Sequence, residues 1–509
     1  MKKIINYIKT NKKYILTIFA ITFIWGIVAY GYMFFNNSFT HDSFVETIAT
    51  QEVINWKISL GRIFYAPYIY LARGTLILPW LIGVISLTFL AVASILILKM
   101  FDIKQDNYWL NILVPGILTV NNTVIALCGS YLQDFDVNMF AMLMSVLAVY
   151  LWKNYKKGYL YGIIPLLLSI GLYQSYISVS LSLIIFLSIF ELLNGNKHQD
   201  VLKKGLKSIA MFLITGTIYF CILKLVPVIL DTGITSGNYN SIDSILNMSF
   251  IDIFKETVFT YLSSIKNFLL PVSVYNSVLV IVIHTVLIFS AGYVLTKRMI
   301  VKNISSISKL MIWLLVLLLP LAMNICRILT NGMSHSLMIY ALWLTYLFIL
   351  LILNDKKYYK LKLVNIILIT IVCIGNIRLA NTVFMIKNIA KDQSDNYLNR
   401  VLYDIENYKN YIDGETKVVI VGVPNMKIEF NNSTDQLRRL VGNMNDFVIP
   451  AGEASRYKLY FSRVLHSNVN VIESQINDIY LLEKIENMPI YPDKNSIQYF
   501  ENILVVKLG

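Results

Sequence analysis

Residues 14–35 read YILTIFAITFIWGIVAYGYMFF, a run that contains no charged side chain. A helix that crosses a membrane needs about 20 consecutive, predominantly apolar residues, and this run meets that length. Ten further segments have a similar composition, so the sequence predicts about eleven transmembrane helices. The eleven segments are 14–35, 75–98, 108–128, 138–152, 159–173, 177–193, 208–230, 277–296, 311–329, 337–353 and 363–384.

The composition of the whole chain supports the same class of protein. Of its 509 residues, 56% are hydrophobic and 15% are charged, whereas soluble domains have about 25% charged residues. An aromatic content of 13% argues against disorder. All four cysteines fall inside apolar stretches, which argues against a disulfide scaffold. We expect no removable signal peptide, because the first apolar segment is long enough to span and no small-residue cleavage site follows it.

The basic residues predict the orientation. Lysines precede the first span, and every second loop after it is basic, as expected for cytoplasmic loops. Most of the formal net charge of +14 lies in these segments rather than in one patch, so we expect no nucleic-acid partner. The N-terminus is predicted to be cytoplasmic, and an odd number of spans places the C-terminal tail outside. The basic loops hold Lys99 and Lys104; Lys153, Lys156 and Lys157; Lys203, Lys204 and Lys207; Lys297, Arg298 and Lys302; and Lys356, Lys357 and Lys360.

The domain organisation follows from this layout. Residues 1–384 form the predicted membrane domain, a polytopic α-helical fold with a long first outer loop at 36–74. Apolar residues such as Trp56 and Phe64 predict amphipathic helices at the membrane interface in that loop. Residues 385–509 are predicted to form a small extracytoplasmic α/β domain. Its expected helices are 392–411, 433–440 and 474–486, and its expected strands are 417–423, 447–449, 469–472 and 503–506.

Carboxylates in the outer loops are candidates for acid–base chemistry. Asp42 follows the first span by a few residues, where partial desolvation would raise the pKa of its carboxyl group and suit it as a general base. The alternative is an ordinary loop residue or the N-cap of a helix that begins at Phe44. Glu46 lies one helical turn later and would share a face with Asp42. Asp134 and Asp136 are expected to orient a sugar hydroxyl or to cap the helix that follows; a metal site has little support.

Several cations lie toward the outer ends of the predicted spans. Arg327, Arg378 and Lys224 occur late in outward-running segments, and Arg62 and Arg73 lie in the first outer loop. Charged side chains at this depth usually face a cavity or a partner, and the arginine fork suits a lipid phosphate. The alternative is snorkelling to ordinary headgroups. The sequence contains no phosphate-binding loop, no nucleophile elbow and no Cys/His metal spacing.

Three motifs together resemble the Gtr-type bacterial glucosyltransferases of the GT-C class. They read ISLGR at 58–62, QDFD at 133–136 and GLYQSY at 171–176, in addition to the Asp42 segment after the first span. The resemblance implies a transferase in the bacterial cytoplasmic membrane that uses an undecaprenyl-phosphate-linked sugar, with glucose as the usual sugar. It implies Asp42 as the base, and it assigns no established role to Tyr173 and Gln174, which we expect to contact sugar or acceptor. Glu46 is expected to assist Asp42 because of its position, not because of the resemblance.

The expected mechanism is an inverting transfer at the outer membrane surface. Arg62, Arg73, Arg327 and Arg378 would hold the donor phosphate, and the acceptor would be a surface polysaccharide or teichoic acid. No cofactor is expected. A flippase and a donor synthase would be partner proteins. The alternatives are a flippase or transporter for lipid-linked sugar, which would need charges through the bilayer, and an O-antigen-type polymerase, which usually has a large late loop.

Overall fold

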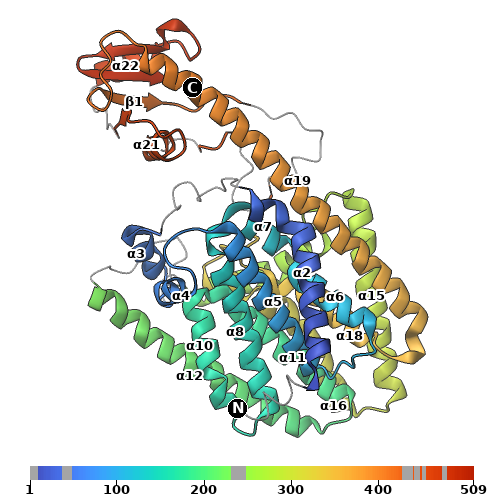
Figure 1. Ribbon diagram of the computed structural model, residues 1–509. Helices are drawn as coiled ribbons and strands as arrows, with labels where there is room; N and C mark the ends of the chain where they lie inside the picture. Colours follow the sequence, from blue (N-terminus) through green and yellow to red (C-terminus); the bar gives the residue numbers. More distant parts are fainter. Residues whose placement is uncertain are drawn as a thin grey trace.

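The computed structural model describes residues 10–36, 49–230, 248–426, 439–440, 447–449, 454–472 and 479–509. In these ranges the chain forms a large bundle of helices, and one long helix connects the bundle to a small domain that contains a sheet (Figure 1). The first half of the bundle contains α2 (Lys12–Phe35), α3 (Gln51–Ser59), α4 (Tyr65–Ala72), α5 (Pro79–Met100), α6 (Tyr108–Thr119), α7 (Asn122–Ser130), η1 (Leu132–Asp134), α8 (Phe135–Asn154), α9 (Gly158–Tyr161), α10 (Ile163–Leu172), η2 (Gln174–Tyr176) and α11 (Ile177–Leu193).

The second half of the bundle begins with the long helix α12, much of whose apolar surface faces outward. Its elements are α12 (His198–Leu230), α14 (Phe250–Leu269), α15 (Ser277–Val301), α16 (Ser306–Met323), α17 (Ile325–Leu329), η3 (Tyr340–Trp343), α18 (Leu344–Ile352), η4 (Lys356–Tyr358) and α19 (Tyr359–Glu406).

Each of the eleven predicted segments contains helix. Among the described residues, eight helices are long and apolar enough to cross a membrane, and a ninth results if α6 and α7, bent by 42°, form one span. The segments Gly158–Leu172 and Tyr340–Ile352 are apolar but shorter. The chain is therefore a membrane protein with at least eight candidate spans, and the number eleven stays a prediction.

The buried side chain of Asn121 explains the bend between α6 and α7. The backbone of Asn121 is extended, and its side-chain oxygen accepts a hydrogen bond from the amide of Val124, which caps α7. Its side-chain nitrogen donates to the carbonyl groups of Ile117 and Leu118 at the end of α6. One side chain thus satisfies backbone groups of both helix ends inside the core, where water does not reach them.

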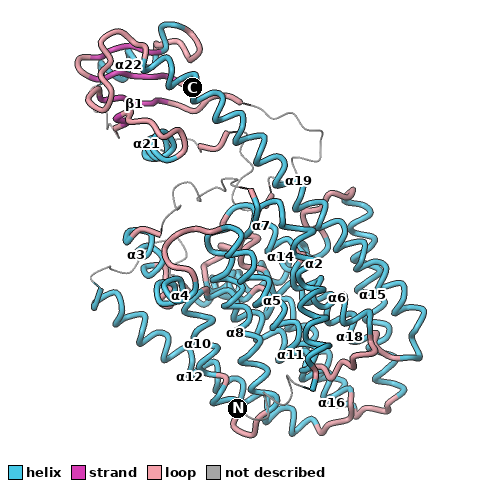
Figure 2. The backbone as a smooth tube through the Cα atoms, in the orientation of Figure 1, coloured by secondary structure: helices cyan, strands magenta, loops and turns pink. Residues whose placement is uncertain are grey.

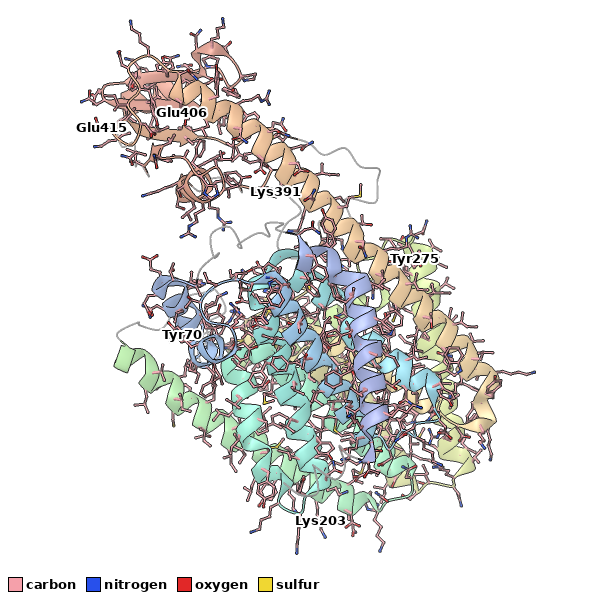
Figure 3. The ribbon with its side chains drawn as sticks, viewed as in Figure 1. Tyr70, Lys203, Tyr275, Lys391, Glu406 and Glu415 are labelled. Atoms are coloured by element: carbon pink, nitrogen blue, oxygen red, sulfur yellow. The ribbon has the colours of Figure 1, made fainter. Side chains whose placement is uncertain are left out.

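A lysine-rich loop and the C-terminal domain lie at opposite ends of the molecule (Figure 3). Lys203 lies at one end of the molecule, whereas Lys391, Glu406 and Glu415 lie toward the opposite end (Figure 3). We call the end that carries the lysine-rich loops the basic end and the other the tail end. Lys204 and Glu191 form an ion pair of 2.7 Å at the basic end. The separation agrees with the topology expected from the sequence, although the orientation in a membrane stays a prediction.

Helix α19 joins the membrane bundle to the C-terminal sheet. We expected two helices, one ending at residue 384 and another at 392–411, but α19 runs without a break from Tyr359 to Glu406. The sequence holds no proline or glycine between Gly375 and Gly414, so nothing stops the helix at the change in composition. The core of the bundle ends with Ala390 on this helix, and the core of the C-terminal domain begins with Tyr397.

The C-terminal domain is a four-stranded mixed sheet with the strand order β2-β1-β4-β3. Strand β1 pairs in parallel with β2 and β4, and β3 pairs antiparallel with β4. The strands are the magenta segments of Figure 2. Its elements are β1 (Lys417–Val421), α21 (Ala454–Arg463), β2 (Asn470–Val471), α22 (Ile479–Glu486), η5 (Lys494–Ser496), β3 (Ile497–Phe500) and β4 (Ile503–Lys507).

Three of the four predicted strands are confirmed in this domain. They correspond to β1, β2 and β4, whereas the predicted strand at 447–449 is wrong, because these residues form a bend. Strand β3 and helix α21 were not expected. Helix α22 confirms the second half of the helix predicted at 474–486, and the helix predicted at 433–440 falls mostly outside the described residues.

Candidate functional site

The described part of the segment between α2 and α5, residues 49–78, contains two short helices. Helix α3 begins after Thr50, whose hydroxyl accepts a hydrogen bond from the amide of Val53 at 3.4 Å. Helix α4 follows the sharp turn at Leu60–Gly61, which the amide of Arg62 closes by donating to the carbonyl of Lys57. Helices were predicted here and are confirmed. They present Lys57, Arg62 and Arg73 to the start of α8.

Asp134 receives two of these cations. The ammonium of Lys57 lies 2.6 Å from Oδ2 of Asp134, and the guanidinium of Arg62 lies 3.2 Å from the same oxygen. The side chains of Lys57 and Asp134 are each 6% exposed. Two cations therefore meet at one oxygen of Asp134. Oδ1 of Asp134 is also buried and makes no hydrogen bond to a described residue.

Asp136 is paired much more completely. Nε of Arg73 lies 2.8 Å from its Oδ2, and both side chains are fully buried. The two terminal nitrogens of Arg73 donate to the carbonyl groups of Gln133 and Leu76 at 2.7 and 2.9 Å. The hydroxyl of Tyr68 adds a bond of 3.3 Å to Asp136. These bonds connect α4 and the segment before α5 to the start of α8. Together they use all three nitrogens of the Arg73 guanidinium.

The turn that carries Arg62 is held by η2 and α12. Nε2 of Gln174 donates to the carbonyl of Leu60 at 2.9 Å and to the hydroxyl of Tyr219 at 3.0 Å. That hydroxyl donates to the carbonyl of Gly61 at 2.9 Å. Gly61 has a φ of +83°, and a Cβ there would lie 2.5 Å from the Tyr219 hydroxyl oxygen and 2.6 Å from Nε2 of Gln174.

The same turn places Arg62 over an aromatic ring. The guanidinium carbon of Arg62 lies 4.7 Å from the centre of the Tyr173 ring, a cation–π contact. The motifs at 58–62 and 171–176 therefore fit together: Gly61 allows the close approach, Gln174 holds the turn, and Tyr173 supports the arginine.

Arg327 of α17 is the fourth cation in this region. Arg327 forms an ion pair of 3.3 Å with Glu256 of α14, and Nε of Arg327 is buried without a hydrogen-bond partner among the described residues. Gly332, at a φ of +88°, lies so close that a Cβ would be 3.0 Å from Oε1 of Glu256. Because α17 packs against η2, the Arg327 segment adjoins the residues that support Arg62.

His335 lies in the loop that follows Arg327. Burial, and after it the positive charge of Arg62, lower the pKa of His335 to about 4. Its imidazole is therefore neutral at pH 7, and its Nδ1 is buried with no hydrogen bond to a described residue. The effect of the Arg62 charge places this histidine in the same electrostatic environment as the arginine.

We refer to these charged and titratable side chains as the polar cluster. It contains four cations, three carboxylates and one neutral histidine. Around it, the side-chain amides of Gln133 and Asn324 are buried, and their oxygen and nitrogen atoms all lack described partners. Unbonded buried polar atoms are uncommon in native structures and indicate water or a ligand. The members of the polar cluster are Lys57, Arg62, Arg73, Asp134, Asp136, Glu256, Arg327 and His335.

The remaining residues expected from the sequence lie elsewhere. Asp42 and Glu46 fall outside the described residues. Arg378 is exposed on α19, where its guanidinium lies 5.8 Å from the centre of the Tyr275 ring, and Lys224 lies over the ring of Phe220 on α12. Neither belongs to the polar cluster. In the described ranges no group of three or more His, Cys, Asp or Glu side chains could hold a metal ion.

Sequence reasoning missed three members of the cluster. Lys57, Glu256 and His335 were not among the site residues expected from the sequence. Their sequence signal is position alone, because each falls in a predicted outer loop between two spans.

Comparison with known proteins gives one match. No curated protein and no solved structure matches the chain. The model of the family described as glucosyl transferase GtrII matches residues 31–333, more than half of the chain, from the end of α2 to the loop after α17. The matched region contains every member of the polar cluster except His335, which follows it by two residues. The chain belongs to the glucosyl transferase GtrII family.

Proposed function

We propose that this glucosyltransferase-family protein transfers glucose from undecaprenyl-phosphate-glucose to a cell-surface glycan at the outer face of the bacterial cytoplasmic membrane. The observation that supports the proposal most is that two partly buried arginines, Arg62 and Arg327, lie at the end of the bundle away from the lysine-rich loops, among buried polar atoms that lack described partners. A lipid phosphate at the membrane surface matches that charge and that position.

Arg62 and Arg327 hold the donor phosphate in this proposal. Both are only partly exposed, with side-chain exposures of 15% and 22%, and each is paired with a carboxylate that keeps it in place. Arg73 and Gln174 act as positioning residues, because the described contacts commit them to Asp136 and to the Gly61 turn. Arg378 takes no part. Asp136 holds Arg73, and Asp134 with Tyr173 lies beside the donor sugar.

The chemical step is an inverting displacement. Asp42, placed by sequence alone, accepts the proton of the acceptor hydroxyl, whose oxygen attacks the anomeric carbon. The bond from that carbon to the phosphate oxygen breaks, and the polyprenyl phosphate leaves as an anion. Arg62 and Arg327 stabilise the charge that develops on the leaving oxygen. Because the phosphate leaves as an anion, no general acid is needed.

The experiment supplies undecaprenyl-phosphate-glucose to the purified full-length protein in nanodiscs, with a surface-glycan fraction as acceptor. Mass spectrometry follows the release of undecaprenyl phosphate and the mass increase of the acceptor. We expect Asp42→Asn to abolish transfer, and Arg327→Ala to raise the KM for the donor about tenfold or more, the effect of one charge-assisted contact. The exposed Arg378→Ala is the matched control and should transfer normally.

Two results would contradict the proposal. Transfer by Asp42→Asn at the normal rate would remove the base, and an unchanged donor KM in Arg327→Ala would remove that residue from the phosphate site. Failure of the unmodified protein to use any polyprenyl-phosphate sugar would reject the donor class itself.

A further inference from the structure

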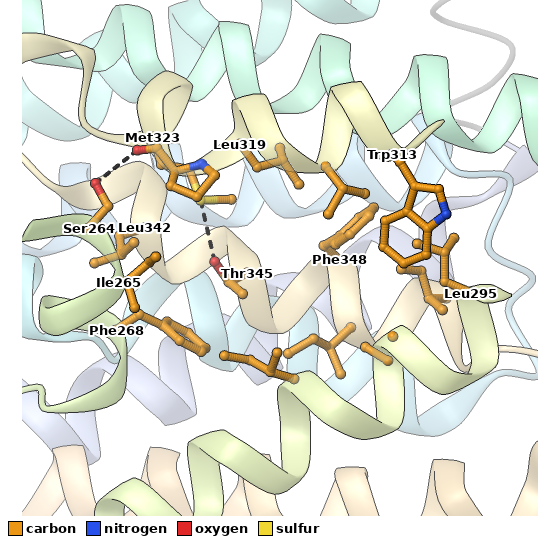
Figure 4. A pocket seen from close by; sticks show the side chains of 17 residues that line it. Ser264, Ile265, Phe268, Leu295, Trp313, Leu319, Met323, Leu342, Thr345 and Phe348 are labelled. Carbon is orange, nitrogen blue, oxygen red and sulfur yellow. Dashed lines mark hydrogen bonds between the residues drawn. The ribbon is translucent and has the colours of Figure 1, made fainter. Parts of the chain in front are cut away.

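An apolar cavity of about 270 Å³ lies inside the second half of the bundle, between α14, α15, α16 and the η3–α18 segment. Figure 4 shows the seventeen side chains that line it. Two of them carry hydroxyl groups, and both hydroxyls donate within the protein. Ser264 donates to carbonyl oxygens of Thr260 and Pro320, and Thr345 to the sulfur of Met323. A cavity lined in this way offers little to water or to a sugar and suits an apolar guest.

The cavity is elongated along α16. Met323, Ser264 and Leu342 lie at one end, and Trp313 and Leu295 at the other (Figure 4). Met323 and Trp313 are ten residues apart on one helix, which corresponds to about 15 Å at 1.5 Å per residue. The guest that fits this shape is a chain rather than a compact molecule.

One end of the cavity continues into segments of the polar cluster. Met323 is followed directly by Asn324 and then by α17, which carries Arg327. Ser264 is eight residues from Glu256 on α14, about 12 Å along the helix axis. Leu342 follows the loop that holds His335. Three walls of the cavity therefore lead from apolar lining to the proposed phosphate site within two or three helical turns.

The cavity also communicates with the outer surface of the bundle. Helices α15 and α16 follow one another in the chain, but they make few direct contacts with each other. Ile288 and Trp313, one on each helix, line the cavity and are also 42% and 40% exposed. In a bilayer this side faces hydrocarbon, so a lipid chain can enter between the two helices.

We infer that this cavity binds the first part of the donor's polyprenyl chain, the part next to the phosphate. This inference rests on the proposed function for its choice of lipid. An ordinary acyl chain would satisfy the apolar walls, but the donor also places a single phosphate beside Arg327 and Arg62. The bound chain would lie along α16, leave the protein between α15 and α16, and fix the direction from which the sugar enters the site.

Gly292 provides a sharp test because it lines the cavity and has nothing within 4 Å of the position that a Cβ would take. Gly292→Leu therefore adds a side chain whose Cβ meets no neighbouring atom, and it replaces a poor helix former by a good one, so the fold should persist. The matched control is Gly216→Leu on α12. Gly216 is also helical, is exposed, and also has nothing within 4 Å of its Cβ position.

The experiment measures two quantities for each full-length protein in nanodiscs. The first is the binding of undecaprenyl phosphate by native mass spectrometry, which does not depend on transfer. The second is the donor KM with undecaprenyl-phosphate-glucose and with a short-chain analogue of two isoprene units. We expect Gly292→Leu to weaken binding and raise the long-chain KM about tenfold, the loss from roughly two buried methylene groups, with a smaller effect on the short chain.

The outcomes separate the two proposals. Equal binding and equal KM in Gly292→Leu, Gly216→Leu and the unmodified protein would overturn the inference and leave the proposed function in place. Loss of polyprenyl-phosphate binding in Gly292→Leu alone, without transfer by any protein, would support the cavity and reject the function. Loss only of co-purified phospholipid, with polyprenyl-phosphate binding intact, would overturn the inference.

Discussion

Replacing Gly61 by alanine should displace Arg62 without unfolding the bundle. The φ of +83° strains any residue that has a Cβ, at a cost of roughly 1–2 kcal/mol. The new methyl group would lie 2.5 Å from the Tyr219 hydroxyl oxygen and 2.6 Å from Nε2 of Gln174, so both side chains must move. The hydrogen bonds that they make to the turn contribute about 1 kcal/mol each. The total is about 3–4 kcal/mol, applied to the turn that positions Arg62.

The expected readout is donor binding rather than expression. With its supporting turn displaced, Arg62 should lose the contact with the donor phosphate that we propose for it, and we expect the donor KM to rise about ten- to a hundredfold. Gly216→Ala, in an open helical position on α12, is the control and should behave like the unmodified protein. A Gly61→Ala protein that elutes normally in size-exclusion chromatography and keeps its donor KM within about twofold would refute the reasoning.

Three further predictions concern the surroundings of the site. Arg73→Ala leaves the carboxylate of Asp136 buried without its cation and should destabilise the protein by about 3–5 kcal/mol, seen as a large fall in apparent Tm; the double variant Arg73→Met/Asp136→Leu should recover part of the loss, and a stable Arg73→Ala would contradict the pairing. His335 has a folded pKa of about 4, below its ordinary value of about 6.5, so it disfavours the folded state as the pH falls through that window; His335→Gln should remove about 2–3 kcal/mol of acid sensitivity between pH 6.5 and 4, measured as the pH dependence of Tm, and identical pH profiles would exclude this role. Arg378→Ala should change Tm by little, since the residue is exposed and contacts only one ring in the described contacts; a fall of many degrees would show that α19 depends on it.

Hydropathy predicted where the membrane helices lie but not how each one ends. The bend after α6 depends on Asn121, whose side chain bonds to two helix ends at once, and such a use of one polar residue is invisible in composition. The continuity of α19 was missed for the opposite reason. The sequence changes from apolar to polar near residue 385, and a change in solvent does not stop a helix that meets no breaker.

The strands that were predicted correctly, β1, β2 and β4, contain β-branched residues. Strand β3 carries glutamine and aromatic residues and is joined to β4 by the two-residue connection at Glu501 and Asn502. Glu501 has a φ of +54°, a conformation for which the sequence offers no glycine as a signal. The strand expected at 447–449 has the right composition but no partner in the described sheet, and pairing is a property of the fold rather than of the segment.

Many candidate residues of the site could be named from the sequence. Which of them contact a ligand and which only hold other residues in place could not be predicted. Arg73 and Asp136 were expected to contact different parts of the substrate. Instead they form an ion pair with each other, although they are 63 positions apart in the chain. Gln174 was expected to meet a sugar and instead bonds to the Gly61 turn. A long-range pair of this kind requires two helices to meet, and no local pattern encodes that meeting.

The two halves of the polar cluster differ in how completely their bonds are made, and this difference separates structure from function. In the first half, Arg73 satisfies one carboxylate and two carbonyl groups, and Tyr68 completes the environment of Asp136, so the charges balance in a closed network. In the second half, two cations share Oδ2 of Asp134 while its Oδ1, Nε of Arg327 and Nδ1 of His335 lack described partners. A closed buried network gains nothing from an added anion, whereas the buried Nε of Arg327, which has no described partner, gains a hydrogen bond from one. A phosphate should therefore bind at the Arg62–Arg327 side and leave the Arg73–Asp136 pair intact.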